Sequence, residues 1–178
     1  MIAVIAFEEA VVSTNEGQKA MGDVQTKYEP KRKQLEAQNT EIENLQKQLQ
    51  ALPANASDDD RGKLMRDIDA KQKQLQLDGQ QTQDAFNADA QAAFNKVMSK
   101  VGGAAVKYAQ EHGFTMLVNF PDPRTERPNQ ILWFLPTSDI TEAVVNAYNL
   151  SSGVAAPAPA APAPQRRPTT PPATAPKK

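Results

Sequence analysis

The sequence contains no cysteine and a single histidine, His112. The missing thiols exclude disulfides, zinc–thiolate sites and Cys–His nucleophile pairs, and their absence is compatible with an oxidising compartment and with the cytosol alike. One imidazole cannot form a histidine metal cluster. His112 stands where the last turn of a helix is predicted, and the helix dipole stabilises a positive charge there. We therefore predict no metal site and no cofactor.

Long apolar runs are also missing. No segment approaches the roughly eighteen apolar residues that a membrane-spanning helix needs. Hydrophobic residues make up 39% of the chain, and mean hydropathy is −0.60. Such a composition is typical of a chain whose length goes into contacts between two helices. The net charge of −1 gives no overall attraction to nucleic acid or anionic lipid, so we expect no nucleic-acid partner and at most a peripheral contact with a membrane.

Catalytic motifs are missing as well. Gly102 and Gly103 lack the lysine and serine that follow in a phosphate-binding loop. The three aspartates at 58–60 lack the ligand spacing of a calcium loop, and a helix start explains them. An enzyme needs polar groups that converge in a cleft, which a two-helix arm cannot form by itself. We predict that the protein is not an enzyme and that it has no catalytic residue.

A heptad pattern is present between residues 21 and 52. Apolar residues recur there at alternating spacings of three and four, so they form a narrow stripe that only another helix can cover. We expect this helix to begin near residue 15, after a capping box made by Ser13 and Glu16, and to continue to Leu52 with a kink near Pro30. The predicted seam of the arm consists of Met21, Tyr28, Leu35, Ile42, Leu45, Leu49 and Leu52.

A second long helix is predicted after a short turn. Pro53 ends the first helix, and Ser57 with the three aspartates behind it begins the next. Gly113 supplies the left-handed stop after His112. The apolar face of this helix contains a stutter, because Leu75 and Phe86 are eleven residues apart. Two long helices joined by a short turn form an antiparallel coiled-coil hairpin.

Apolar runs at both ends of the chain predict a small β body. Residues 2–7, 115–120 and 131–134 are strand candidates, and Asp139 with Glu142 predicts a capping box for a short last helix. The fold class is α+β, mostly α. We assign residues 1–14 to a body strand and connector, 15–112 to the hairpin arm with its turn near 53–57, 113–150 to body strands and the short helix, and 151–178 to a disordered Ala/Pro-rich tail.

The order of these parts resembles the OmpH family, the Skp-like periplasmic chaperones. The resemblance covers residues 2–150 and is carried, in order, by IAVIAF, TNEGQKA, KYEPKRKQLEAQNTEIENLQKQLQ, KYAQEHGFTMLVN and DITEAVVNAYN. It implies a jellyfish-like homotrimer whose arms enclose a cavity. It also implies an ATP-independent holdase that binds unfolded outer-membrane proteins in the periplasm. The chain opens without a leader segment, so export implies a signal peptide already removed.

The resemblance also directs attention to particular residues. A short apolar strand leaves an open edge in a monomer, which closure by symmetry would cover. The expected trimer interface is Ile2, Val4, Ile5, Phe7, Ile131, Trp133 and Phe134. Candidates for contact with a client lie off the seam, where methionine is adaptable, and ordinary packing in the hairpin is the alternative for each of them. They are Met65, Leu77 and Met98.

The charge of the arm departs from the family pattern. Known members are strongly basic, whereas residues 15–112 hold fourteen basic and fifteen acidic residues. We therefore do not infer from the resemblance that this chain has an electrostatic client site or a lipopolysaccharide site. Two other functions fit the sequence. One is a structural or tethering coiled coil of the cell envelope with the tail as spacer, and the other is a cytosolic holdase resembling prefoldin.

Overall fold

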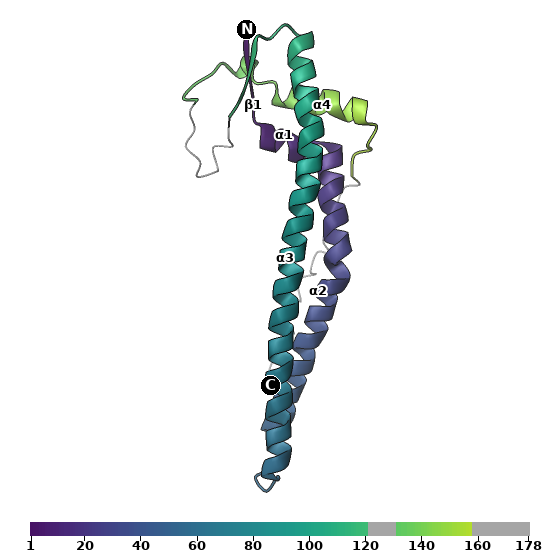
Figure 1. Cartoon of the computed structure of the whole chain (residues 1–178), viewed down its shortest axis with the longest axis vertical. Helices are drawn as coiled ribbons and strands as arrows, with labels where there is room; N and C mark the ends of the chain where they lie inside the picture. The colour runs from purple at the N-terminus through teal and green to yellow at the C-terminus, as the bar shows by residue number, and fades with distance from the viewer. Residues whose placement is uncertain (121–130, 158–178) are drawn as a thin grey trace, which may run out of the picture.

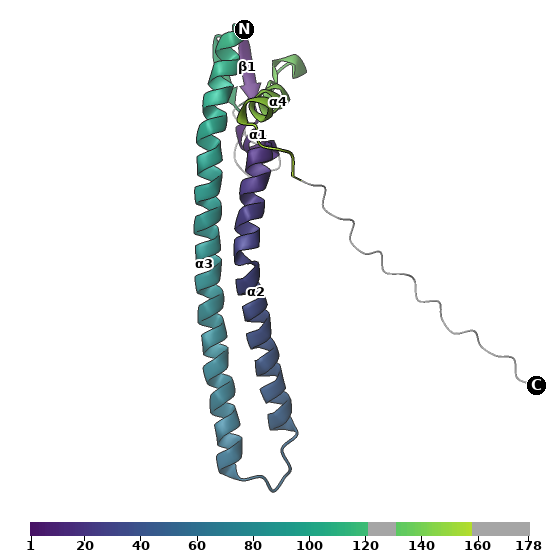
Figure 2. The same ribbon diagram turned by 90° about the vertical axis from the view of Figure 1, so that its right-hand side faces the viewer.

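The computed structural model describes residues 1–120 and 131–157. Two long helices, α2 (Asn15–Gln50) and α3 (Asp58–Glu111), lie side by side as an antiparallel hairpin (Figure 1). The remaining elements gather at the end of α3 that is farthest from the hairpin turn (Figure 2). They are β1 (Ile2–Ile5), α1 (Phe7–Ser13), β2 (Met116–Asn119), the 3-10 turn η1 (Pro136–Ser138) and α4 (Thr141–Ser152).

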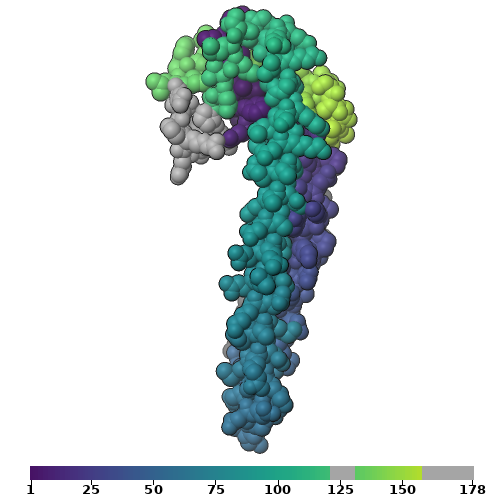
Figure 3. Space-filling view, viewed as in Figure 1, coloured from purple at the N-terminus to yellow at the C-terminus, as the bar shows by residue number. Residues whose placement is uncertain are grey.

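The molecule is a small body with one long arm, as the space-filling view shows (Figure 3). At 1.5 Å per residue, the 54 residues of α3 span about 80 Å. Because α3 is longer than the 36-residue α2, its last turns extend beyond the start of α2 and contribute to the body. The predicted long helices of an α+β, mostly α chain are confirmed. The predicted disordered tail lies outside the described residues from 158 onward.

The sheet of the body has two parallel strands. Ile2 pairs with Met116 and Ile5 pairs with Asn119. Parallel strands need a crossover connection, and here the whole arm is that connection. Side chains alternate between the two faces of a strand. Ala3 and Ile5 accordingly join the buried core, whereas Ile2 on the opposite face is 54% exposed.

The core lies where α1, α3 and α4 cover one face of this sheet. Its fully or nearly buried members come from the sheet and from all three helices, so the core joins these elements. The cluster is Ala3, Ile5, Ala10, Val11, Val97, Val101, Ala105, Ile140, Val144, Val145 and Tyr148.

The predicted third strand at residues 131–134 is wrong. This segment has no strand structure, and β1 instead forms a single parallel bridge from Val4 to Asp139. The backbone N–H of Ile140 donates to the Val4 carbonyl at 3.0 Å. The position beside β1 is therefore already occupied. Pro136, which lacks an N–H and opens η1, also prevents the apolar run from continuing as a strand.

Two of the predicted helix caps differ from those in the structure. The N-cap of α2 is Thr14, not Ser13, and its hydroxyl accepts from the Gly17 N–H at 3.0 Å. Asp139 accepts from the backbone N–H of Thr141 at 2.9 Å, so it does not form the predicted capping box with Glu142. The N-cap of α3 at Ser57 and the left-handed Gly113 (φ 72°) are confirmed. Helix α2 continues through Pro30 and ends at Gln50, two residues before the predicted end.

Candidate functional site

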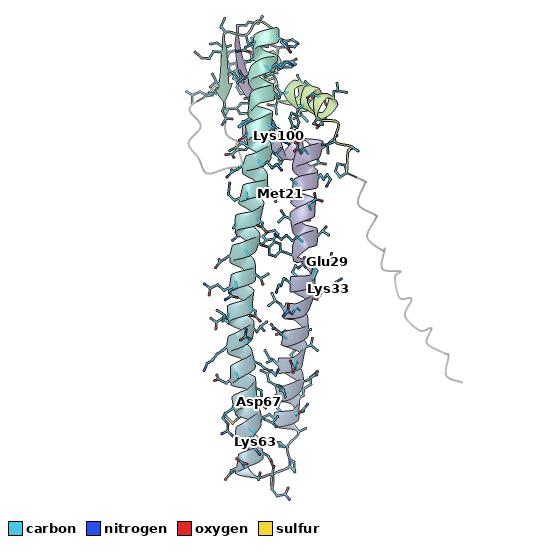
Figure 4. All side chains as sticks on the ribbon, turned by 45° about the vertical axis from the view of Figure 1, so that its right-hand side comes forward. Met21, Glu29, Lys33, Lys63, Asp67 and Lys100 are labelled. Carbon is cyan, nitrogen blue, oxygen red and sulfur yellow. The ribbon has the colours of Figure 1, made fainter. Side chains whose placement is uncertain are left out.

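One carboxylate joins three helices where the arm meets the body. Glu16, in the first turn of α2, accepts hydrogen bonds at 2.5 Å from the Lys100 ammonium of α3 and at 2.5 Å from the Tyr148 hydroxyl of α4. Figure 4 shows Lys100 at this level of the arm. The hydrogen bond from Lys100, followed by that from Tyr148, lowers the pKa of Glu16. Burial and the same bond raise the pKa of Tyr148. We call Glu16, Lys100 and Tyr148 the root latch.

The root latch predicts a dependence of stability on acid pH. The pKa of Glu16 is lower in the folded state than in the unfolded state, where glutamate titrates near 4.3. Its contribution to the free energy of unfolding is therefore complete above about pH 5 and is lost as the pH falls through the folded-state pKa. Glu16→Gln is expected to lower the free energy of unfolding at pH 7 by about 1–3 kcal/mol, because a hydrogen bond to a charged group contributes about this much. The cost should become smaller as the pH falls from about 5 toward 3. Urea unfolding followed by circular dichroism at pH 7 and at pH 3 measures it.

The matched control for this experiment is Glu36→Gln, which changes an exposed carboxyl of the arm. We expect it to change the unfolding free energy by less than about 0.5 kcal/mol, the usual range for surface substitutions. An equal loss for Glu16→Gln at pH 7 and at pH 3 would contradict the role of the ionised latch.

The turn between α1 and α2 is tightly packed. Thr14 is fully buried, and its hydroxyl donates to the Val11 carbonyl at 2.8 Å while it accepts from Gly17. A Cβ atom on Gly17 would lie 2.1 Å from that same carbonyl oxygen. Asn15 ties this turn to the end of α4, because its N–H donates to the Asn149 side chain at 2.9 Å. The turn therefore fixes the direction in which the arm leaves the body.

Polar and aromatic contacts join the two helices of the arm below the root. Tyr28 meets Phe86 edge-on at a centroid distance of 5.5 Å, and its hydroxyl donates to Asp89 at 2.7 Å. Lys27 donates to the same carboxylate at 2.6 Å. The hydrogen bonds from Lys27 and then Tyr28 lower the pKa of Asp89. Near the predicted stutter, Asp78 accepts from Gln38 at 2.8 Å and from Gln74 at 2.7 Å.

Six of the seven predicted seam residues belong to α2, which packs mainly against α3, and Leu52 follows the end of this helix. Tyr28 and Ile42 are buried, and Val24, also on this stripe, is buried as well. The other five are half-buried, which leaves the arm with a thin apolar core. They are Met21, Leu35, Leu45, Leu49 and Leu52.

Two of the three predicted client contacts point outward on the arm. Met65 is 56% exposed and Leu77 is 50% exposed, both on α3. Met98 instead packs against the core of the body, which removes it from the outward-facing candidates. Sequence spacing alone could not make this distinction, because all three lie off the heptad seam.

The predicted interface residues fall into two groups. Ile5 belongs to the core and Phe7 packs against it, so these two face the interior of the subunit. Val4 is also buried, but it lies on the same face of β1 as Ile2 and lines the groove on that face. Ile2 and Trp133, by contrast, are 54% and 76% exposed, while Ile131 and Phe134 are half-buried. The outward group lines an apolar groove of about 320 Å³ over the outer face of the sheet. Leu135, which the sequence analysis did not select, is also exposed and lines this groove, and Leu132 of the same segment is exposed as well.

Neither a metal site nor a membrane span is found in the part of the chain that the structure describes. Within residues 1–120 and 131–157, no three His, Cys, Asp or Glu side chains are grouped so that they could hold a metal ion. No helix in the same ranges combines the length and the apolar character of a transmembrane segment.

The fold and these surfaces define a scaffold that presents side chains along a coiled-coil arm and on an open apolar face of its body. Residues 1–148 match the family described as outer membrane protein (OmpH-like). The chain belongs to this family, and the resemblance drawn from the sequence is confirmed. A crystal structure from Caulobacter crescentus CB15, described as an OmpH-like candidate outer membrane chaperone, is 22% identical and has a TM-score of 0.67. The match covers 84% of each chain, so the two share a fold. Comparison with curated proteins gives no match.

Proposed function

We propose that the protein is an ATP-independent holdase chaperone of the periplasm that binds unfolded outer-membrane proteins between the arms of a homotrimer. The observation that carries the proposal is the arm, an OmpH-like helical hairpin that α3 extends to about 80 Å. Its surface is mainly polar, yet Met65 and Leu77 stand exposed on it. A long arm with scattered apolar side chains suits weak contacts with an unfolded chain at many points.

Self-association would supply the cavity that one arm lacks. The apolar groove beside Ile2 and Trp133, with Leu132 and Leu135 at its side, is a surface of the kind that marks protein contacts. We propose this outward group, with Ile131 and Phe134, as the trimer interface. Val4 lines the same groove, and Ile5 and Phe7 would support the interface from inside each subunit.

Apolar contacts would carry most of the affinity for clients. The basic and acidic residues of the arm nearly balance, and five of the eight ion pairs formed by described residues join positions four apart on one helix. Exposed pairs of this type contribute little energy and leave no strong field to attract a charged client.

Two measurements test the proposal together. Size-exclusion chromatography with light scattering should give the mass of a trimer at micromolar concentration. The same sample should suppress aggregation of an unfolded β-barrel protein diluted from urea, without ATP. A monodisperse monomer or dimer contradicts the cavity, whereas a trimer that fails to suppress aggregation favours a tethering coiled coil.

The outward side chains of the arm give a sharper prediction. The double substitution Met65→Ser and Leu77→Ser should weaken suppression of aggregation several-fold, because each exposed apolar side chain contributes on the order of 1 kcal/mol to a contact. The trimer mass and the thermal midpoint should not change. The matched control replaces two exposed polar residues of the same helix, Gln76→Ser and Gln80→Ser. Equal activity of both variants would exclude these two positions as client contacts.

Salt dependence provides an independent prediction. If apolar and backbone contacts dominate, the dissociation constant for an unfolded β-barrel protein should change less than about tenfold between low salt and about half-molar sodium chloride, which is under ~1.4 kcal/mol. Ending the chain at Gly153 should leave this binding intact, because the proposed client contacts lie on the arm and not on the Ala/Pro-rich tail. Fluorescence anisotropy of a labelled client measures both. A steep decrease with salt would place the client site at basic residues instead.

A further inference from the structure

A second groove of the body has an aromatic part and an acidic part. It has a volume of about 640 Å³ and lies between α1, the segment 134–139 and the first turns of α4. Its apolar lining includes Pro136 and the rings of Phe120 and Phe134, which lie 4.9 Å apart at 45°. Its charged lining is acidic throughout. The carboxylates are Glu9, Asp139 and Glu142.

Outside α3, the described part of the body shares this sign of charge. In residues 1–14, 113–120 and 131–157, the charged side chains are the two glutamates of α1, Asp139 and Glu142, and there is no lysine or arginine. A groove in this region therefore favours a cationic ligand. Paired aromatic rings beside a proline suit an extended proline-rich segment, which presents flat rings at a regular spacing.

The tail of this chain has the complementary composition. Residues 154–178 contain eight prolines and four basic residues but no acidic residue. The basic residues occur in two pairs, Arg166–Arg167 in the middle and Lys177–Lys178 at the end. The arginine pair is followed immediately by Pro168, so cationic groups and proline rings are adjacent in the sequence.

The tail also begins close enough to reach the groove. It leaves the body at Val154, whose carbonyl accepts from the Asn15 side chain at 2.8 Å, directly after Gly153 in a left-handed conformation (φ 65°). The groove lies at the other end of α4, a helix of 12 residues and therefore about 18 Å. The twelve residue-to-residue steps from Val154 to Arg166 span up to about 37 Å in an extended proline-rich conformation, at about 3.1 Å per step. That length allows the chain to turn back along α4.

We propose that the Ala/Pro-rich tail of this protein docks in the Phe120–Phe134 groove. Its prolines lie against the two rings, and Arg166 and Arg167 meet Glu9, Asp139 and Glu142. The docked tail bridges α1, the segment 134–139 and α4, and so clasps the outside of the body. This inference concerns a contact within the protein and is independent of client binding.

Energy transfer in the full-length chain tests the docking. Trp133, the only tryptophan, lies next to Phe134 and serves as donor. The chain has no cysteine, so Gln165→Cys accepts a single dansyl acceptor. Transfer should be high at low salt. Reversing the tail charges (Arg166→Glu, Arg167→Glu) or the groove charges (Glu9→Lys, Glu142→Lys) should each shift the docking equilibrium about tenfold, or roughly 1.4 kcal/mol.

Combining the two reversals should restore transfer, since the opposite charges then meet again. The control for the groove variant is Glu36→Lys with Asp67→Lys, which makes the same charge change on the arm and should have no effect. Transfer that is equal in all variants overturns the proposal. Adding phosphatidylglycerol vesicles, to which the tail could bind, gives a second test. If the vesicles lower energy transfer in the wild type no more than in the groove variant, the proposal is also overturned, because the partner of the tail would then be an anionic surface.

Discussion

Replacing Ile5 by aspartate is expected to unfold the body, whereas the same replacement at Ile2 should leave the subunit folded. The two residues belong to one strand but point to opposite faces of the sheet. Ile5 is 2% exposed inside the core, and Ile2 is 54% exposed beside the apolar groove. An unpaired carboxylate in the core costs several kcal/mol, a large share of the stability of a small domain.

Thermal unfolding followed by circular dichroism, together with light scattering, separates the two effects. Ile5→Asp should lose the cooperative transition of the body, and any oligomer would be lost with it. Ile2→Asp should keep its transition but shift from trimer toward monomer, because the charge would lie in the proposed interface. An Ile2→Asp variant that remains trimeric would exclude this face as the site of assembly. A folded Ile5→Asp variant would contradict the packing of the core.

Gly17→Ala should destabilise the protein strongly, although alanine is ordinarily the better helix residue. The added methyl group would lie 2.1 Å from the Val11 carbonyl oxygen and 3.0 Å from the Thr14 hydroxyl, so the turn between α1 and α2 would have to open. We expect a loss of about 2–4 kcal/mol in the free energy of unfolding, which is the range for overpacking against a fixed backbone combined with loss of a cap.

Gly22→Ala is the control in the same helix. Nothing lies within 4 Å of a Cβ atom at that position, so the substitution should stabilise the protein by about 0.5–1 kcal/mol through helix propensity. Urea denaturation measures both variants. Opposite signs are the expected result, and a stabilising Gly17→Ala would show that the close contact with Val11 does not exist in solution.

The parts of the fold that the sequence predicted correctly are those with a local signal. The two long helices follow from the heptad spacing, and the start of α3 follows from Ser57 and the aspartates behind it. The start of α2 at residue 15 was predicted, but its N-cap was misassigned by one residue for a long-range reason. Ser13 and Glu16 have the spacing of a capping box, but Glu16 bonds instead to Lys100, 84 residues away, and the buried Thr14 becomes the cap.

The candidate site shows the same division. Periodicity selected Tyr28 and Ile42, which are buried, because neighbouring turns of a helix share a face. It could not place the root latch, since Tyr148 is 132 residues from Glu16 and no spacing rule connects them. Nor could it show that Ile5 is interior while Ile2 and Trp133 are not. That distinction depends on which face of the strand the helices α1, α3 and α4 cover.

The crossover that links β1 to β2 has a consequence for how the protein folds. The strands pair across 114 residues, as Ile2 with Met116, so the sheet is a contact of very high sequence separation and should form late. The hairpin turn brings nearby residues together first, which favours closure of the arm from its tip toward the body. During synthesis β1 emerges first and stays without a partner until the arm is complete. The unpaired edge of β1 would therefore be exposed until synthesis of the arm is complete. During that time the chain is open to aggregation, and binding by another chaperone would protect it.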